Sequence, residues 1–295
     1  MKTGCFIYSD NKKYDKLQEC AIRSFKKFHP EIPIFHTSSK IKNSQENEEI
    51  PCGYKKLIFS YLIAKERNIE KIIILGADTI TCDRLDEFLS DDSTDILTTL
   101  DYPYQLRMSF VSTNQINTKN INSISNLILS SSDQDHVNGD IVCFNNSEAL
   151  KETINCMQWM SNEYFEQGAL NFICNIQNKY TSKIVDGDYE NSNVVYNARS
   201  KGNTCERNPK DKPWFKYTNL FKVENKKLFT GTHKNCSKSK QIKIWHYIEG
   251  FSGYSDQKIE ESINTWINEG FNQETKDFFT NECDCGDFFK QKFII

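Results

Sequence analysis

The sequence predicts an α/β protein with a mixed, mostly parallel sheet flanked by helices. After Lys71, residues 72–75 form an apolar run that is typical of a strand buried on both faces. A strand (4–9), a helix (14–28) and a short strand (32–35) open the chain in the order of a βαβ unit. The apolar run ends at a Gly-Ala-Asp sequence (76–78), and ligands of open α/β sheets bind beyond the carboxyl ends of strands.

The rest of the chain continues this alternation. Alternating or continuous apolar residues predict strands, and apolar residues spaced by three and four predict helices. The predicted strands are 95–101, 141–145 after a polar turn at 137–140, 189–197 and 242–247, and the predicted helices are 54–64, 85–89, 147–157, 163–176 and a stretch after Gly253. We predict one sheet domain over 1–254 and a helical C-terminal extension over 255–295.

Three local features are also predicted from residue type. Ser147 is expected to cap the helix that follows it, because serine is favoured at that position. Residues 102–104 (Tyr-Pro-Tyr) are expected to turn the chain away from the preceding strand. Lys55 and Lys56 come early in their helix and are expected to face solvent, with a phosphate contact as the alternative.

The composition is that of a globular protein and excludes several function classes. Of 295 residues, 38% are hydrophobic and 26% are charged, which is not the composition of a disordered chain. The net charge of -3 gives no case for nucleic acid or an anionic membrane as the main partner. No apolar run approaches the roughly 20 residues of a membrane span, and the first residues turn polar too soon for a signal peptide. We therefore expect no integral membrane segment and a cytoplasmic location.

The eleven cysteines are scattered along the chain. The close pair is Cys283 and Cys285, and there is no pair of CxxC motifs, which argues against a structural zinc site. In the absence of an export signal we expect reduced thiols that pack mostly as small apolar residues.

Several predicted strands have a polar residue at one end: Asp78, Asp101, Asn138 and His246. Each alone has an ordinary explanation as a turn residue or a hydrogen-bonded scaffold residue. Converging at one edge of a sheet, they predict a ligand site. Asp78 with His246 would make a mixed oxygen and nitrogen site suited to Mn²⁺, with phosphates and water as the remaining ligands. Such a metal would neutralise a diphosphate leaving group.

The same residues carry a family resemblance. The chain has Gly-Ala-Asp at 76–78, Asn-Gly-Asp at 138–140, Glu-Gln-Gly-Ala-Leu-Asn at 166–171 and Ile-Trp-His-Tyr-Ile-Glu-Gly at 244–250. This ordered set resembles the GT-A glycosyltransferases of the glycogenin and lipopolysaccharide galactosyltransferase type, glycosyltransferase family 8, over about residues 4–254. The chain also looks similar to glycosyltransferases of large DNA viruses. The resemblance implies a GT-A (Rossmann-like) sheet and, for a viral source, a location in the host cytoplasm or the virion.

The resemblance also implies roles for individual residues. Asp78 and His246 would hold the metal, and Tyr8 and Asp10 would touch the base and ribose of the donor. Asp101, Asn138, Glu166 and Gln167 would line the donor-sugar pocket, and Lys56 would lie near the donor. The residues expected to be catalytic are Asp101, Asp140, Glu166 and Gln167. Arg199 and Lys201 are additional expected phosphate contacts that the family pattern does not include.

Three departures from the family pattern bear on the metal and the phosphates. Gly76 replaces the first Asp of the Asp-x-Asp motif, so one metal or ribose contact is missing. Glu166 replaces the Asp of an Asp-Gln pair, and the Lys-Pro-Trp that follows the family's histidine motif is absent. The expected cofactor is therefore Mn²⁺ or Mg²⁺, with weakened or lost binding. The family retains configuration, whereas Asp140 or Glu166 acting as general base would give inversion, and this choice stays open.

We expect an enzyme that moves a hexose or N-acetylhexosamine from a UDP-linked sugar to a glycan or protein acceptor. The alternative is a non-catalytic carbohydrate- or partner-binding module on the same scaffold, which Gly76 and the missing lysine favour. A third hypothesis is a nucleotidyltransferase, but no Gly-rich basic loop follows the first strand.

Overall fold

The computed structural model describes residues 1–9, 14–37, 52–105, 135–157, 165–185, 195–197, 221–230, 239, 241–246, 256–265, 267–268 and 271–286. The chain divides into two compact units. Unit 1 contains Met1–Asp10, Pro33–Leu75 and Asp86–Val185, and unit 2 contains Asn11–Ile32, Gly76–Leu85 and Asp186–Ile295. The domain boundary expected at residue 254 stays a prediction.

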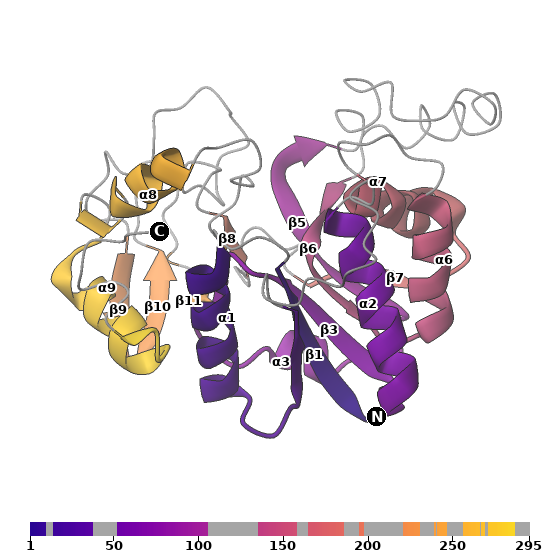
Figure 1. Cartoon of the computed structure of the whole chain (residues 1–295), viewed down its shortest axis with the longest axis horizontal. Coiled ribbons are helices and arrows are strands. Elements are labelled where there is room, and N and C mark those ends of the chain that lie inside the picture. The colour runs from indigo at the N-terminus through magenta and orange to yellow at the C-terminus, as the bar shows by residue number, and fades with distance from the viewer. Residues whose placement is uncertain are drawn as a thin grey trace. The chain divides into compact units, whose positions relative to one another are not determined.

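Unit 1 is built on a six-stranded sheet with helices between the strands (Figure 1). Its elements are β1 (Thr3–Tyr8), β2 (Ile34–His36), α2 (Cys52–Arg67), β3 (Lys71–Gly76), α3 (Asp86–Leu89), β5 (Ile96–Gln105), β6 (Asp135–Phe144), α6 (Ser147–Met157), α7 (Phe165–Phe172), the π-helix η3 (Ile173–Gln177) and β7 (Ser182–Ile184). The strand order is β2-β1-β3-β6-β5-β7. β1 and β2 are parallel, as are β5 and β7, whereas β6 is antiparallel to both β3 and β5. The predicted fold class, a mixed and mostly parallel sheet flanked by helices, is confirmed.

Both faces of β3 are buried, as its apolar run predicts. Ile72 and Ile74 belong to a core that includes residues of α2, α6 and α7. Ile73 and Leu75, which alternate with them and so face the other way, are fully buried as well. Both faces of β3 are apolar, so a slip of one residue would exchange its faces and still bury apolar side chains. The register of β3 therefore depends on its pairing with the neighbouring strands.

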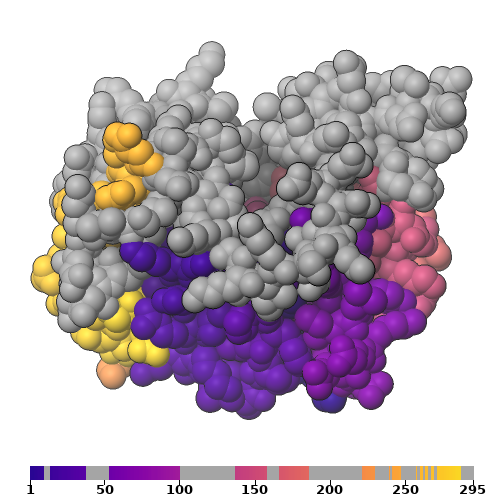
Figure 2. Space-filling model, in the orientation of Figure 1, coloured from indigo at the N-terminus to yellow at the C-terminus, as the bar shows by residue number. Residues whose placement is uncertain are grey.

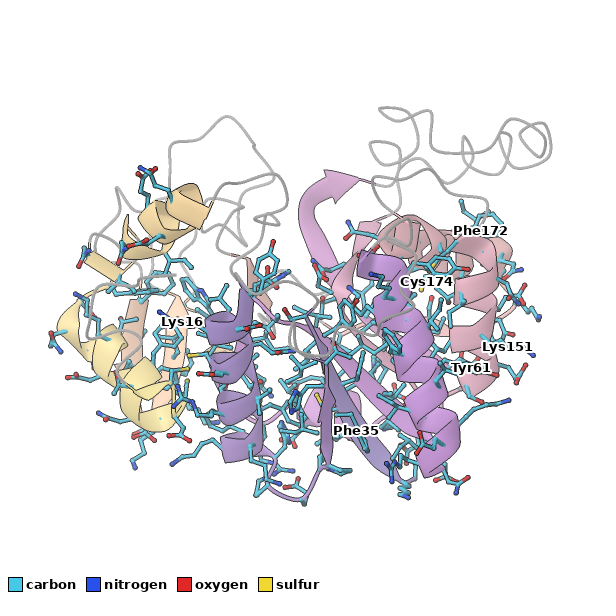
Figure 3. All side chains as sticks on the ribbon, viewed as in Figure 1. Lys16, Phe35, Tyr61, Lys151, Phe172 and Cys174 are labelled. Carbon is cyan, nitrogen blue, oxygen red and sulfur yellow. The ribbon has the colours of Figure 1, made fainter. Side chains whose placement is uncertain are left out.

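Three helices pack together over one face of this sheet. The surfaces of α2 and α6 adjoin in Figure 2, and α7 contacts both helices. In Figure 3, Tyr61 of α2 and Lys151 of α6 lie on these neighbouring helices, and Phe172 and Cys174 mark the passage from α7 into η3. Phe172 and Cys174 are buried in the same core as Ile72, so the helix predicted over 163–176 packs as expected where the structure describes it.

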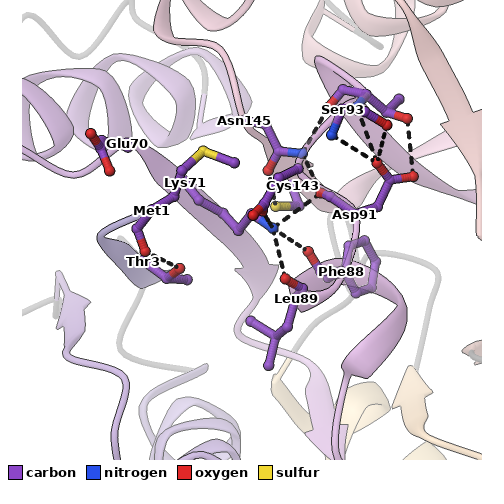
Figure 4. A network of polar contacts seen from close by, with 12 residues as sticks. Met1, Thr3, Glu70, Lys71, Phe88, Leu89, Asp91, Ser93, Cys143 and Asn145 are labelled. Atoms are coloured by element: carbon purple, nitrogen blue, oxygen red, sulfur yellow. Dashed lines mark hydrogen bonds and ion pairs between the residues drawn. The ribbon is translucent and has the colours of Figure 1, made fainter.

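The amino end of β3 is fixed by a buried lysine (Figure 4). Lys71 is 1% exposed, and its ammonium donates to the carbonyl oxygens of Phe88 (3.0 Å), Leu89 (3.0 Å) and Asp91 (3.1 Å). It also pairs with the carboxylate of Asp92 at 2.7 Å. Because a buried charge is costly without such partners, these contacts bind β3 firmly to the end of α3.

The two longest strands differ from the sequence prediction. β5 continues through residues 102–104, so the predicted turn there is wrong, and residues 137–140 lie inside β6 and not in a turn before it. Thr98 pairs with Val142 and Leu100 with Val137, so two steps along β5 (98 to 100) oppose five along β6 (142 to 137). β6 therefore bulges over 138–141. The polar residues that suggested a turn belong to this bulge.

The predicted cap of α6 is also wrong by one residue. α6 begins at Ser147, and Asn146 before it accepts the backbone N–H of Glu148 through Oδ1 at 2.9 Å. The Asn146 amide nitrogen donates to Asp95 Oδ1 at 2.7 Å. Asn146 is thus the capping residue, because asparagine serves that position as well as serine and here gains a second partner.

Unit 2 contains two three-stranded sheets and the C-terminal helices. Its elements are α1 (Asp15–Phe28), β4 (Thr79–Thr81), β8 (Val195–Asn197), β9 (Phe221–Glu224), β10 (Lys227–Thr230), β11 (Gln241–Ile242), β12 (Ile244–His246), α8 (Asp256–Thr265), α9 (Gln273–Asp277) and the π-helix η7 (Phe278–Glu282). The sheets have the orders β4-β12-β8 and β11-β10-β9. Trp245 is fully buried in this unit's core, with its ring 5.1 Å from that of Phe271 and 5.6 Å from that of Phe279.

The hairpin of β9 and β10 has no counterpart in the sequence prediction. Asn225 and Lys226 join the strands, and both have positive φ (50° and 60°). Two left-handed residues in a row are typical of the tightest hairpin turns, where Asn-Gly is the usual sequence. Because the second position here is a lysine and not a glycine, the sequence does not indicate this turn.

The C-terminal part is helical, as predicted. Ile263 and Ile267, two members of the expected apolar face, are buried in the core of unit 2, whereas the side chains of Ile259 and Trp266 lie outside the described residues. Across the ranges that the structure covers, no helix combines the length and apolar character needed to cross a membrane.

Candidate functional site

In unit 1 the bulge of β6 lies at the end of the sheet where β3 finishes. Leu75, close to the carboxyl end of β3, pairs with Ile141, and the bulge residues come just before Ile141 in sequence. Because β6 is antiparallel to β3, the bulge extends past the end of β3. Asn138 and Asp140 therefore lie at the edge where α/β sheets bind ligands, although they arrive on an incoming strand and not at the end of an outgoing one.

Helix α7 holds this bulge in place. The fully buried Asn171 accepts the N–H of Val137 at 2.9 Å and donates to the Val137 carbonyl at 3.0 Å. One turn earlier, Gln167 Oε1 accepts the N–H of Gly139 at 3.2 Å. A Cβ at Gly139 would lie 3.0 Å from Gln167 Cβ and 3.2 Å from its Cα. A side chain at position 139 would therefore crowd the α7 backbone, and glycine avoids this contact.

Lys56 of α2 joins the bulge to α7. Its ammonium donates to the Gly139 carbonyl at 2.9 Å and to Asp140 Oδ1 at 2.6 Å, and it lies 3.5 Å from Glu166 Oε1. Lys56 is only 3% exposed, so the expectation that it faces solvent is wrong. We call Lys56, Asp140 and Glu166 the Lys56 cluster. A single buried ammonium between two carboxylates fixes both of them and leaves the cluster with a net negative charge.

Tyr8, expected to contact the base, ends β1 in the same unit. It is 5% exposed, and its ring stacks on that of Phe59 with centroids 6.2 Å apart and planes 25° apart. Most of the ring is therefore committed to the core, which leaves little of its surface for a ligand.

In unit 2 the pairing of β4 with β12 brings Asp78 and His246 together. After β3 the chain turns through Ala77 and Asp78 into β4, whose first residue, Thr79, pairs with His246. The Asp78 Oδ1 and His246 Nε2 atoms are 3.4 Å apart. The Asp78 side chain is 15% exposed and the His246 side chain 2% exposed. The two expected metal ligands thus adjoin one another.

The donor set of this pair can be tested against a divalent ion. Two ligand atoms about 2.1 Å from one ion and at roughly a right angle are about 3 Å apart. The observed 3.4 Å corresponds to a slightly wider angle, so the pair fits as two neighbouring ligands. Within the described ranges no group of three or more His, Cys, Asp and Glu side chains could hold a metal. Any ion here would need further ligands, such as phosphate oxygens and water.

Four expected site residues lie wholly or partly outside the described residues. Asp10, Arg199 and Lys201 lie outside the described residues, and Asp101 lies within β5 with its side chain outside them. Sequence reasoning missed Asn171 and Gly53 as parts of the site. Asn171 stands within the Glu-Gln-Gly-Ala-Leu-Asn motif, so the motif itself could have indicated it. Nothing in the sequence indicates Gly53, because it matters through its closeness to the Glu166 carboxylate of α7.

Comparison with known proteins gives similarity of fold. No protein-family model matches the sequence, and no curated protein matches it. Among solved structures the chain is similar to the apo structure of WbbM, a bifunctional glycosyltransferase, with a TM-score of 0.49 and 12% identity over 88% of this chain and 49% of that chain. The chain thus spans about half of WbbM.

Two smaller glycosyltransferases are also similar. The galactosyltransferase LgtC, in complex with donor and acceptor sugar analogues, matches with a TM-score of 0.47 and 12% identity over 93% of this chain and 99% of that chain. A glycosyltransferase involved in the glycosylation of the major capsid of PBCV-1 matches with a TM-score of 0.42 and 12% identity over 68% of this chain and 87% of that chain.

Proposed function

We propose that the chain is a glycosyltransferase that takes a hexose or N-acetylhexosamine from a UDP-linked sugar and passes it to a glycan or protein acceptor. The observation that supports this most is the separation of 3.4 Å between Asp78 and His246, which come from distant motifs of the sequence. The pair would hold Mn²⁺ or Mg²⁺, and the bound ion would supply positive charge to a departing diphosphate.

The Lys56 cluster would orient the donor sugar. The side chains of Asp140 and Glu166 are 39% and 22% exposed, so solvent-side oxygens can accept hydrogen bonds from sugar hydroxyls. Lys56, with a side chain 4% exposed, holds both carboxylates from the protein side. Carboxylates held in fixed positions can hold a substrate in the geometry that its reaction needs, so we assign Asp140 and Glu166 the role of orienting the donor sugar. Gln167 is already bonded to Gly139, and we assign it the positioning of the bulge that carries Asn138.

Four further contacts complete the proposal. Tyr8 would contact the base, Asp10 the ribose, Asp101 the donor sugar, and Arg199 with Lys201 the phosphates. The anomeric configuration of the product decides between retention and inversion of configuration, and it is measured by proton NMR of the released sugar.

Titration calorimetry with UDP, in the presence and absence of Mn²⁺, tests the proposal. We expect Asp78→Ala and His246→Ala each to weaken Mn²⁺-dependent UDP binding at least about tenfold. Loss of a residue that only hydrogen-bonds to a metal ligand already costs about tenfold in metal affinity, and loss of a ligand should cost no less. Asp83→Ala is the matched control: it is a carboxylate of the same segment with an 18% exposed side chain, paired with Lys227 at 3.2 Å. Absence of UDP binding, or equal binding in all four proteins, would contradict the proposal.

A non-catalytic binding module on the same scaffold is the second candidate. The observation that favours it is Gly76, which leaves the pair without the further carboxylate of an Asp-x-Asp motif. Hydrolysis or transfer of any UDP-sugar that is lost in Asp78→Ala eliminates this candidate. Binding of a sugar without any turnover, unaffected by Asp78→Ala, would instead support it.

A further inference from the structure

The first turn of α2 accommodates a carboxylate that comes from α7. Gly53 is the second residue of α2. A Cβ built at Gly53 would lie 1.8 Å from Glu166 Oε2 and 2.6 Å from Oε1. Both distances are far below van der Waals contact, so the Glu166 carboxylate occupies the volume that a side chain at position 53 would fill.

Gly53 and Lys56 are related by the geometry of α2. Residues three apart in an α-helix lie on the same face, one above the other. Glu166 is therefore located over Gly53 and within 3.5 Å of the ammonium of Lys56 at the same time. A carboxylate that is displaced from Gly53 would also move relative to Lys56.

The electrostatics of α2 favour this arrangement. The N-terminal turn of a helix carries a partial positive charge, which an anion stabilises. The first turn of α2 has no acidic residue of its own. Glu166 supplies the negative charge from another element, and it can approach closely because position 53 has no side chain.

We propose that Gly53 is a positioning residue of the Lys56 cluster and that the side chains at 53 and 166 are matched in size. Glycine at 53 lets a glutamate at 166 reach Lys56 across the first turn of α2. The consequence for the donor sugar rests on the proposed function, whereas the size match does not. Replacement of Gly53 by alanine displaces the carboxylate of Glu166 and leaves Lys56 with the carboxylate of Asp140 and the carbonyl of Gly139.

A double-mutant cycle in thermal stability tests the size match without any ligand. Gly53→Ala in the wild-type background should lower the melting temperature by about 2 °C or less, because the new methyl group displaces a partly exposed carboxylate from its contact with Lys56. In the Glu166→Ala background the same change should leave the melting temperature unchanged or raise it, because alanine is the better helix former once no carboxylate is in the way. Gly4→Ala is the matched control. Its Cβ would also make a tight contact, at 3.1 Å, but with Phe35 and not with Glu166. Gly4→Ala should have the same effect in both backgrounds.

Turnover of a UDP-sugar tests the consequence for the site. Gly53→Ala should lower kcat on the order of 10²-fold, the scale of a misplacement of about 1 Å. In the Glu166→Asp background, where the carboxylate is one methylene shorter and clears the new methyl group, Gly53→Ala should change kcat less than about threefold.

Equal effects of Gly53→Ala on the melting temperature in the wild-type and Glu166→Ala backgrounds would overturn the proposal. A coupling in melting temperature together with equal losses of kcat in the wild-type and Glu166→Asp backgrounds would overturn its functional part. If the wild-type chain neither binds nor turns over a UDP-sugar, the proposed function fails, and the stability cycle still decides whether Gly53 positions Glu166.

Discussion

Asn171 and Val137 are joined by two hydrogen bonds between one side chain and one residue's backbone. The Asn171 oxygen accepts the Val137 N–H at 2.9 Å, and the Asn171 nitrogen donates to the Val137 carbonyl at 3.0 Å. Val137 directly precedes the bulge of β6, where regular pairing with β5 is interrupted. Val137 keeps its pairing with Leu100 of β5, and the asparagine supplies partners for both of its backbone groups where the bulge begins.

Asn171→Ala should destabilise unit 1 and disorder the bulge. Both backbone groups of Val137 would lose a buried partner, at a cost of about 1–3 kcal/mol for each group. Urea unfolding measures the loss. Asn175→Ala is the control, because it removes a donor to the same Asn171 oxygen (3.2 Å) without touching Val137. A control variant as unstable as Asn171→Ala would show that the contact with Val137 has no special weight.

Stability should fall in acid partly through Asp91. Partial burial raises the pKa of Asp91, but hydrogen bonds from Ser93, Thr94 and Lys183 outweigh burial and hold this pKa well below its usual range. The folded chain therefore binds its proton less readily than the unfolded chain. The stabilisation is complete above the unfolded pKa of about 3.9 and is lost as the pH falls below it.

Urea unfolding midpoints between pH 6 and pH 3 check this dependence. Asp91→Asn should lower the midpoint at pH 6 and should reduce the fall toward pH 3. Part of the fall should remain, because hydrogen bonds from Asn146 and Thr181 outweigh partial burial and also lower the pKa of Asp95. Parallel curves for Asp91→Asn and wild type over the whole range would contradict the prediction.

The sequence predicts what depends on neighbours along the chain. The apolar run of β3 and the helical spacing of α1 and α6 needed only local patterns. The sequence predicts that Asp78 and His246 meet as strand ends of one sheet. They do adjoin, but through a different sheet, because Asp78 directly precedes β4, and β4 pairs with β12.

The features that were missed depend on distant residues. Lys56 is buried because Asp140 and Glu166 reach it from β6 and α7, and a sequence of two adjacent lysines at a helix start gives no sign of this. The bulge of β6 follows from its register with β5, which no local pattern fixes. In the same way, Gly53 looks like an ordinary helix glycine until the position of Glu166 is known.

The buried cysteines should resist alkylation while the chain is folded. All eight cysteines whose side chains the structure describes are buried with free thiols, as expected for small apolar residues. Burial raises the pKa of Cys143, Cys156 and Cys174 to about 12. At pH 8 each then has on the order of 10³-fold less thiolate than an ordinary cysteine with a pKa of about 8.5. Peptide mass spectrometry after iodoacetamide treatment should find these three unmodified in native protein and modified in urea. Rapid native modification of Cys143 would contradict the burial.

Lys71→Met should destabilise unit 1 more than loss of the carboxylate that pairs with Lys71. Methionine preserves most of the side-chain volume but leaves three backbone carbonyl oxygens without the ammonium donor (Figure 4). Asn145 still donates to the Asp91 carbonyl at 2.7 Å, so two carbonyls lose their donor. Each costs about 1–3 kcal/mol, so the free energy of unfolding should fall by about 2 kcal/mol or more. Asp92→Asn is the matched control, since its 58% exposed side chain is screened by water and should change stability little. Urea unfolding of the two variants decides the matter: equal losses would mean that the ion pair, and not the carbonyl contacts, anchors β3 to the end of α3.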